Sequence, residues 1–121
     1  MNLETPNGAI DILMVGNDSR MSYLIKRYAE QSRLTMDNTI NLPTIADLQK
    51  INPSFIIFSS LDVLQASQAW IVNLDDMAIQ ILVCSGIGEE AAARESGADD
   101  CLFHPLTYDD FRNALAPNWR M

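Results

Sequence analysis

The chain has 121 residues, of which 48% are hydrophobic, enough to fill the core of one domain of ordinary size. Eight lysine and arginine residues against sixteen aspartate and glutamate residues give a formal net charge of −8. That charge repels a phosphate backbone, so we expect no direct binding to nucleic acid.

The sequence predicts neither a membrane span nor a secretory signal. Its longest apolar runs, residues 55–58 and 81–84, are far shorter than the roughly 20 residues that cross a bilayer. The first residues, Met1 to Pro6, have neither the basic region nor the apolar stretch of a signal peptide. We therefore expect a cytoplasmic protein without membrane contacts.

The cysteines do not suggest a metal site. Cys84 and Cys101 each lie in an apolar, strand-like run, where free cysteines are usually buried. The single histidine, His104, and these two distant cysteines show no ligand spacing. We expect two reduced core thiols, no metal and no cofactor.

The first part of the chain alternates strand-like and helical patterns. An apolar run over residues 10–15 predicts a strand, and apolar residues at helical spacing over 21–28 predict a helix. A weaker strand is expected over 34–40. Thr44, with Asp47 three residues later, indicates the capped start of a short helix.

The same alternation continues in the middle of the chain. Residues 55–59 predict the third strand, and apolar residues over 61–74 predict a single third helix. Residues 79–84 predict the fourth strand. A flexible connection over 85–88 then leads to a fourth helix that begins at Glu89.

The last part completes the pattern. Gly97 is typical of the position that follows a helix, and residues 101–103 predict a short fifth strand. Thr107 with Asp110 indicates the cap of a fifth helix, which we expect Pro117 to stop.

Five strands alternating with five helices predict an α/β fold, a doubly wound parallel sheet covered on both faces. Ligands of such sheets bind beyond the carboxyl ends of the strands. The candidate positions are therefore residues 16–19, 59–62, 85–88 and 104–105.

One ten-residue run resembles a known family. The run is Gly97-Ala98-Asp99-Asp100-Cys101-Leu102-Phe103-His104-Pro105-Leu106. It is similar to the Gly-Ala-Asp-Asp-Tyr-Leu-x-Lys-Pro-Phe pattern of the receiver domains of two-component response regulators. The resemblance covers roughly residues 10–116. It implies a flavodoxin-like sheet of strand order 2-1-3-4-5 and a single receiver-like domain over residues 1–121.

The resemblance also locates the phosphoryl-accepting pocket. The family's acidic pair, which holds Mg²⁺, falls on Gly16 and Asn17, while Asp18 keeps an acid often found at the third position. The phosphoacceptor aspartate falls on Ser59. A serine hydroxyl is a poor nucleophile unless a base activates it.

Of the remaining pocket positions, one matches the family pattern and two depart from it. The switch serine or threonine falls on Ser85 and is intact, whereas the phosphate-pairing lysine falls on His104 and the switch aromatic on Cys101. Acids and lysine are thus lost together, which leaves a near-neutral pocket that needs no metal to fold. We expect the hydroxyl of Ser59 or Ser60 to cap the next helix rather than to accept a phosphoryl group.

The leading hypothesis is a non-catalytic pseudo-receiver that binds a signalling protein or a second copy of itself without phosphorylation. Its docking surface is expected on the fourth helix, the fifth strand and the fifth helix. The candidate face residues are Glu90, Arg94, Asp99, Tyr108, Asp109 and Arg112.

Two alternatives remain open at this stage. The first alternative is an atypical receiver that accepts a phosphoryl group at Ser59, Asp62 or Asp18. The second is a module that binds a small anion at the strand ends. The first loop lacks the G-x-G-x-x-G pattern of dinucleotide sites. The sequence also leaves open whether Trp119 packs on the domain or meets a partner.

Overall fold

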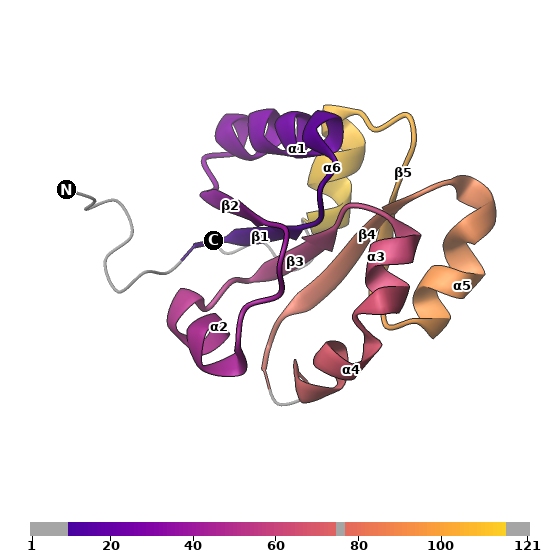
Figure 1. The fold of residues 1–121 in the computed structure, drawn as a ribbon. Coiled ribbons are helices and arrows are strands. Elements are labelled where there is room, and N and C mark those ends of the chain that lie inside the picture. The colour runs from indigo at the N-terminus through magenta and orange to yellow at the C-terminus, as the bar shows by residue number, and fades with distance from the viewer. Residues whose placement is uncertain (1–9, 75–76, 116–121) are drawn as a thin grey trace.

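A computed structural model describes residues 10–74 and 77–115 (Figure 1). They form one five-stranded parallel sheet of order β2-β1-β3-β4-β5, with helices on both faces. This confirms the predicted flavodoxin-like topology. The expected stop at Pro117 and the packing of Trp119 lie outside the described residues.

The strands are short and in simple parallel register. Ile12 on β1, for example, lies opposite Met36 on β2 and Phe55 on β3. The five strands are β1 (Ile12–Val15), β2 (Met36–Thr39), β3 (Phe55–Phe58), β4 (Gln80–Ser85) and β5 (Asp100–Phe103).

Across residues 10–74 and 77–115, six α-helices connect or follow the strands. They are α1 (Ser19–Gln31), α2 (Ile45–Ile51), α3 (Leu61–Ala66), α4 (Gln68–Ile71), α5 (Glu90–Glu95) and α6 (Tyr108–Leu115). In the part of the chain that the structure describes, a 3-10 turn over Val72–Leu74 follows α4 and another over Ile87–Glu89 precedes α5. No helix in the ranges 10–74 and 77–115 is both long enough and apolar enough to span a membrane.

The alternation of side chains along the strands builds two core layers. On one face, Ile12 and Met14 of β1 pack in a cluster with residues of α1 and α6, including Ile25 and Phe111. On the other face, Leu13 and Val15 belong to a cluster that includes residues of α2, α3 and α5. Figure 1 shows α1 and α6 on one side of the sheet and α2 to α5 on the other.

The predicted third helix is wrong as a single element. Helix α3 ends at Ala66, and the buried Ser67 separates it from α4. The Ser67 hydroxyl donates to the carbonyl of Val63 at 2.8 Å, while its N–H donates to Leu64 O at 3.0 Å. A serine that bonds back to the preceding turn competes with the helical pattern, which accounts for the break.

A side-chain clamp that sequence analysis missed joins the starts of β1 and β2. The Asp11 carboxylate accepts hydrogen bonds from the N–H of Thr35 at 2.8 Å and from its hydroxyl at 3.1 Å. In return, the Thr35 hydroxyl oxygen accepts the N–H of Asp11 at 2.9 Å. The pair therefore satisfies two backbone donors beside the first residues of the β1–β2 ladder.

Candidate functional site

The candidate pocket lies at the carboxyl ends of the strands. Gly16 follows β1, Ser59 follows β3, Ser85 ends β4 and His104 follows β5. The parallel register sets Val15 opposite Phe58, and Phe58 opposite Val83. The fold therefore brings these four sequence-predicted positions to one edge of the sheet (Figure 1).

Gly16 and Ser59 are packed against each other. Gly16 has φ +138°, a left-handed backbone that favours glycine, and its N–H donates to Thr39 O at 2.9 Å. A Cβ added at Gly16 would collide with Ser59 Oγ and would lie 2.7 Å from Ser59 Cβ. Ser59 is buried, with its own N–H donating to Val15 O at 2.9 Å. Backbone and packing both exclude an acidic side chain at position 16.

The two neighbouring positions do not replace the missing acid. Asn17 is exposed, and Asp18 is exposed at the N-terminus of α1. Asp18 Oδ1 accepts the N–H of Met21 at 3.0 Å, which makes it the cap of that helix. Within residues 10–74 and 77–115, no group of three His, Cys, Asp or Glu side chains could hold a metal ion.

The two serines after β3 have different roles. Ser60 Oγ accepts the N–H of Val63 at 3.3 Å and caps α3, as expected for this pair. Ser59 does not cap the helix, because its side chain is turned against Gly16. The capping prediction therefore holds for Ser60 alone.

Ser85 holds a buried hydroxyl without a hydrogen-bond partner. It is 2% exposed, and its Oγ is the one buried side-chain polar atom left unpaired in the described part of the chain. The Cys101 thiol is close enough for the hydroxyl to act on its pKa, which burial raises and Ser85 lowers. A thiol is a weak hydrogen-bonding group, so we regard Ser85 Oγ as unsatisfied.

We expect Ser85→Ala to leave stability unchanged or raise it by about 1 kcal/mol, because it removes an unsatisfied buried hydroxyl. Denaturant unfolding measures the effect. Ser67→Ala is the matched control: its hydroxyl is equally buried but bonded to Val63, so its loss should cost about 1 kcal/mol. Equal losses in both variants would show that Ser85 has a partner.

The other two predicted positions, His104 and Cys101, differ in burial. His104 is exposed, and its N–H donates to Ser85 O at 3.2 Å. Cys101 is buried in the core cluster of the opposite face from α6. Cys84 is buried too, and burial raises the pKa of its thiol to about 12. Both cysteines are free thiols, as the sequence predicted.

Three of the candidate face residues belong to one polar cluster. Arg94 pairs with Glu90 at 3.0 Å and with Asp100 at 3.3 Å, and it also donates to Asp99 O at 2.8 Å. The Asp99 carboxylate accepts the N–H of Ile81 at 2.8 Å, so it extends the β4–β5 ladder. Asp99 therefore has a structural task at the beginning of β5.

Tyr108, on α6, packs against α1. Its ring centroid lies 5.6 Å from that of Tyr28 on α1, and its hydroxyl is 3.0 Å from that of Ser32. The Arg112 guanidinium stands over the Tyr108 ring, 5.9 Å from its centroid. The structure thus places the half-buried Tyr108 of α6 against α1, and its part in a docking surface stays a prediction.

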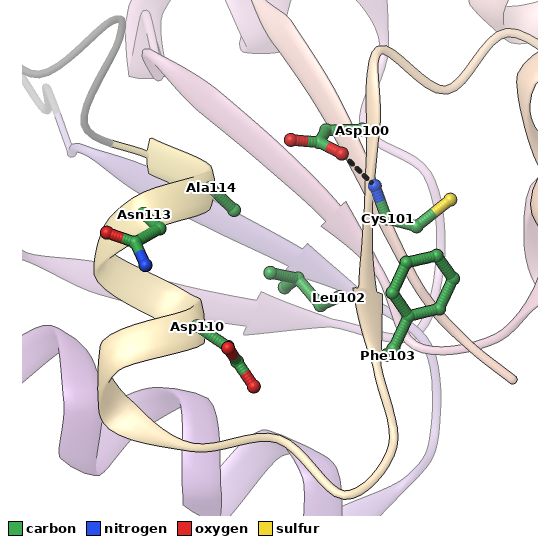
Figure 2. A pocket seen from close by; sticks show the side chains of 7 residues that line it. All are labelled: Asp100, Cys101, Leu102, Phe103, Asp110, Asn113 and Ala114. Carbon is green, nitrogen blue, oxygen red and sulfur yellow. Dashed lines mark hydrogen bonds between the residues drawn. The ribbon is translucent and has the colours of Figure 1, made fainter. Parts of the chain in front are cut away.

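A hollow between β5 and α6 has a different set of lining residues. They are Asp100, Cys101, Leu102, Phe103, Asp110, Asn113 and Ala114 (Figure 2). Sequence analysis named Cys101 as the switch-aromatic position, Asp110 as part of a helix cap and Asp100, Leu102 and Phe103 within the family-like run, but it predicted no hollow here. The helical phase could have found three of the lining residues, because Phe111 and Leu115 face the core and leave 110, 113 and 114 together on the side of α6.

Comparison with solved structures identifies the class of fold: this is the fold of response-regulator receiver domains. The receiver domain of a sensor histidine kinase from Pseudomonas aeruginosa PAO1 matches with TM-score 0.72 and 11% identity, over 90% of this chain and 96% of that one. That protein has a magnesium ion in its active-site cleft.

Two further structures illustrate the range. A response regulator receiver protein from Burkholderia phymatum matches with TM-score 0.69 and 16% identity over 88% of this chain and 93% of that one. An orphan response regulator of H. pylori matches with TM-score 0.66 and 21% identity, over 93% of this chain and 98% of that one. The sequence matches none of the protein-family models and none of the curated proteins.

Proposed function

We propose that the chain is a pseudo-receiver: a non-catalytic signalling module that binds a protein partner without being phosphorylated. The observation that supports this most directly is the contact between Gly16 and Ser59. In the alignment with the receiver pattern, these positions hold a metal-binding acid and the phosphoacceptor. Here a serine side chain occupies the space that an acid at position 16 needs.

Electrostatics support the same proposal. A pocket with three close carboxylates requires Mg²⁺ and a lysine to offset their repulsion. Gly16, Asn17 and Ser59 contribute no charge, and His104 stands where the lysine falls. The remaining acid, Asp18, already caps α1. The pocket can therefore fold without a cation.

The docking surface that we propose is formed by α5, β5 and α6. It presents the Glu90–Arg94–Asp100 cluster and the hollow between β5 and α6, and Asp100 belongs to both. Asp109 and Arg112 are exposed on α6. We expect the affinity of a partner for this surface to be independent of phosphorylation.

The test is a titration of Mg²⁺ with beryllofluoride, a mimic of a bound phosphoryl group, into ¹⁵N-labelled protein. We expect no change in amide shifts at residues 16–18, 59–60, 85 and 104, because the pocket lacks the carboxylate that binds the mimic. Incubation with acetyl phosphate and Mg²⁺ should likewise add no phosphoryl mass. Saturable shifts centred on Ser59 and Ser85 would contradict the proposal and restore a phosphate-responsive switch.

A further inference from the structure

The hollow beside β5 has an apolar base and an acidic rim. In Figure 2, Asp100 and Leu102 point from β5 toward α6, while Cys101 and Phe103 point to the other side of the strand. Leu102 is 1% exposed and forms the apolar base together with Ala114. Asp100, Asp110 and Asn113 form the polar rim.

The two carboxylates of the rim keep unused acceptor capacity. Asp100 Oδ1 accepts the N–H of Cys101 at 2.8 Å and lies 3.3 Å from Arg94, and the side chain is still 44% exposed. Asp110 uses its N–H to bond Thr107 Oγ1, and its exposed carboxylate pairs with no cation of the described chain. A carboxylate offers about four acceptor sites, so both acids can bind a further donor.

Charge is distributed unevenly around this hollow. Residues 86–115 contain seven acidic side chains and two arginines, a net charge of −5. One of the arginines, Arg94, is already held by Glu90 and Asp100. Helix α1, which packs beside α6, has Arg20, Lys26 and Arg27 on its exposed side, so the acids are concentrated on α5, β5 and α6. The potential at the hollow therefore favours a cationic occupant.

We propose that the hollow binds a basic segment of a partner protein and that an arginine of that segment inserts between Asp100 and Asp110. The aliphatic stem of arginine suits the base of Leu102 and Ala114, and the planar guanidinium suits two carboxylates and an amide oxygen. This inference rests on the proposed interaction function and names the chemistry of its partner.

The chain provides a matched pair of variants. Asp110 and Asp109 are adjacent acids in the first turn of α6, and both are exposed. Only Asp110 lines the hollow. Asp110→Asn and Asp109→Asn remove the same charge and the same interaction with the helix dipole. A difference between them therefore reports on the hollow.

The probe is the blocked peptide Gly-Ser-Leu-Arg-Leu-Arg-Ser-Gly, titrated into ¹⁵N-labelled protein at low ionic strength, where screening is weak. We expect saturable amide shifts at residues 100–103 and 110–114. Asp110→Asn should weaken binding of this peptide about fivefold, whereas Asp109→Asn, on the same surface but outside the hollow, should change it by about twofold or less. Asn113→Asp, which adds a carboxylate to the rim, should tighten binding.

Other outcomes would overturn the proposal. Equal weakening in both aspartate variants, or shifts spread over other acids, would indicate attraction by net charge alone. Shifts at the hollow on concentrating the protein without peptide would indicate a second copy as occupant, and shifts at residues 116–121 in Asp110→Asn would indicate the chain's own end. A peptide with glutamate in place of arginine is the control. The beryllofluoride titration tests the proposed function separately, because it does not involve the hollow.

Discussion

Gly16→Asp, which places an acid where the receiver pattern has a metal ligand, is expected to destabilise the protein by about 3 kcal/mol or more. A non-glycine residue in a sparsely populated left-handed region costs about 1–3 kcal/mol. Insertion of extra atoms into a packed site adds about 1–3 kcal/mol. Gly16 meets both conditions, with φ +138° and Ser59 Oγ in the place of a Cβ.

Denaturant unfolding measures this loss, and Mg²⁺ titration of the same variant should show no specific binding. Asn17→Asp is the matched control: it adds an acid at the next, exposed position and should change stability by about 0.5 kcal/mol or less. Gly16→Ala should cost less when Ser59 is replaced by glycine, because the two sites share one space. A fully stable Gly16→Asp protein that binds Mg²⁺ would show that the loop rearranges freely.

Asp11→Ala is expected to destabilise the protein by about 2 kcal/mol, because it removes the carboxylate of the β1–β2 clamp. Hydrogen bonds to a charged acceptor contribute about 1.5–3 kcal/mol, and the loss leaves the Thr35 N–H without its partner. β2 is an edge strand that pairs only with β1, so few other contacts compensate for the loss.

Thermal unfolding of Asp11→Ala should show a melting temperature lower by roughly 4 °C for each kcal/mol lost. Asp37→Ala, on the edge strand β2, is the control. Its exposed carboxylate accepts only the amide of the next residue, Asn38, so a loss of about 0.5 kcal/mol or less is expected. Asp11→Asn keeps one acceptor oxygen and should fall between the two. Equal stability of Asp11→Ala and Asp37→Ala would exclude a stabilising clamp.

The sheet could be predicted well from the sequence, because its central strands are continuous apolar runs that need burial on both faces. Residues 55–58 and 81–85 are buried throughout, and both runs became strands close to the predicted bounds. The edge strand β2, over Met36–Thr39, is shorter than the predicted 34–40, and its exposed Asp37 and Asn38 made it the weakest strand pattern in the sequence. The break at Ser67 was missed, because apolar periodicity does not register a side chain that bonds to its own backbone.

The pocket positions were located correctly at one edge, but their contacts could not be predicted. The packing of Ser59 against Gly16 and the pairing of Asp11 with Thr35 join segments that are far apart in sequence, and no local pattern reports such contacts. Tyr108 is a further example, because its contacts with Tyr28 and Ser32 join α6 to α1 over a long sequence separation.

The contact between Gly16 and Ser59 also bears on how such a protein can evolve. In Gly16→Asp, the new side chain would collide with Ser59. Ser59→Asp would bury a carboxylate without a counter-charge. His104→Lys alone would add a cation without an anionic partner in the pocket. Each single step toward a working pocket therefore lowers stability or gains no chemistry. For the pseudo-receiver that we propose, a gain of phosphoryl transfer would therefore require several substitutions together, because positions 16 and 59 share one space.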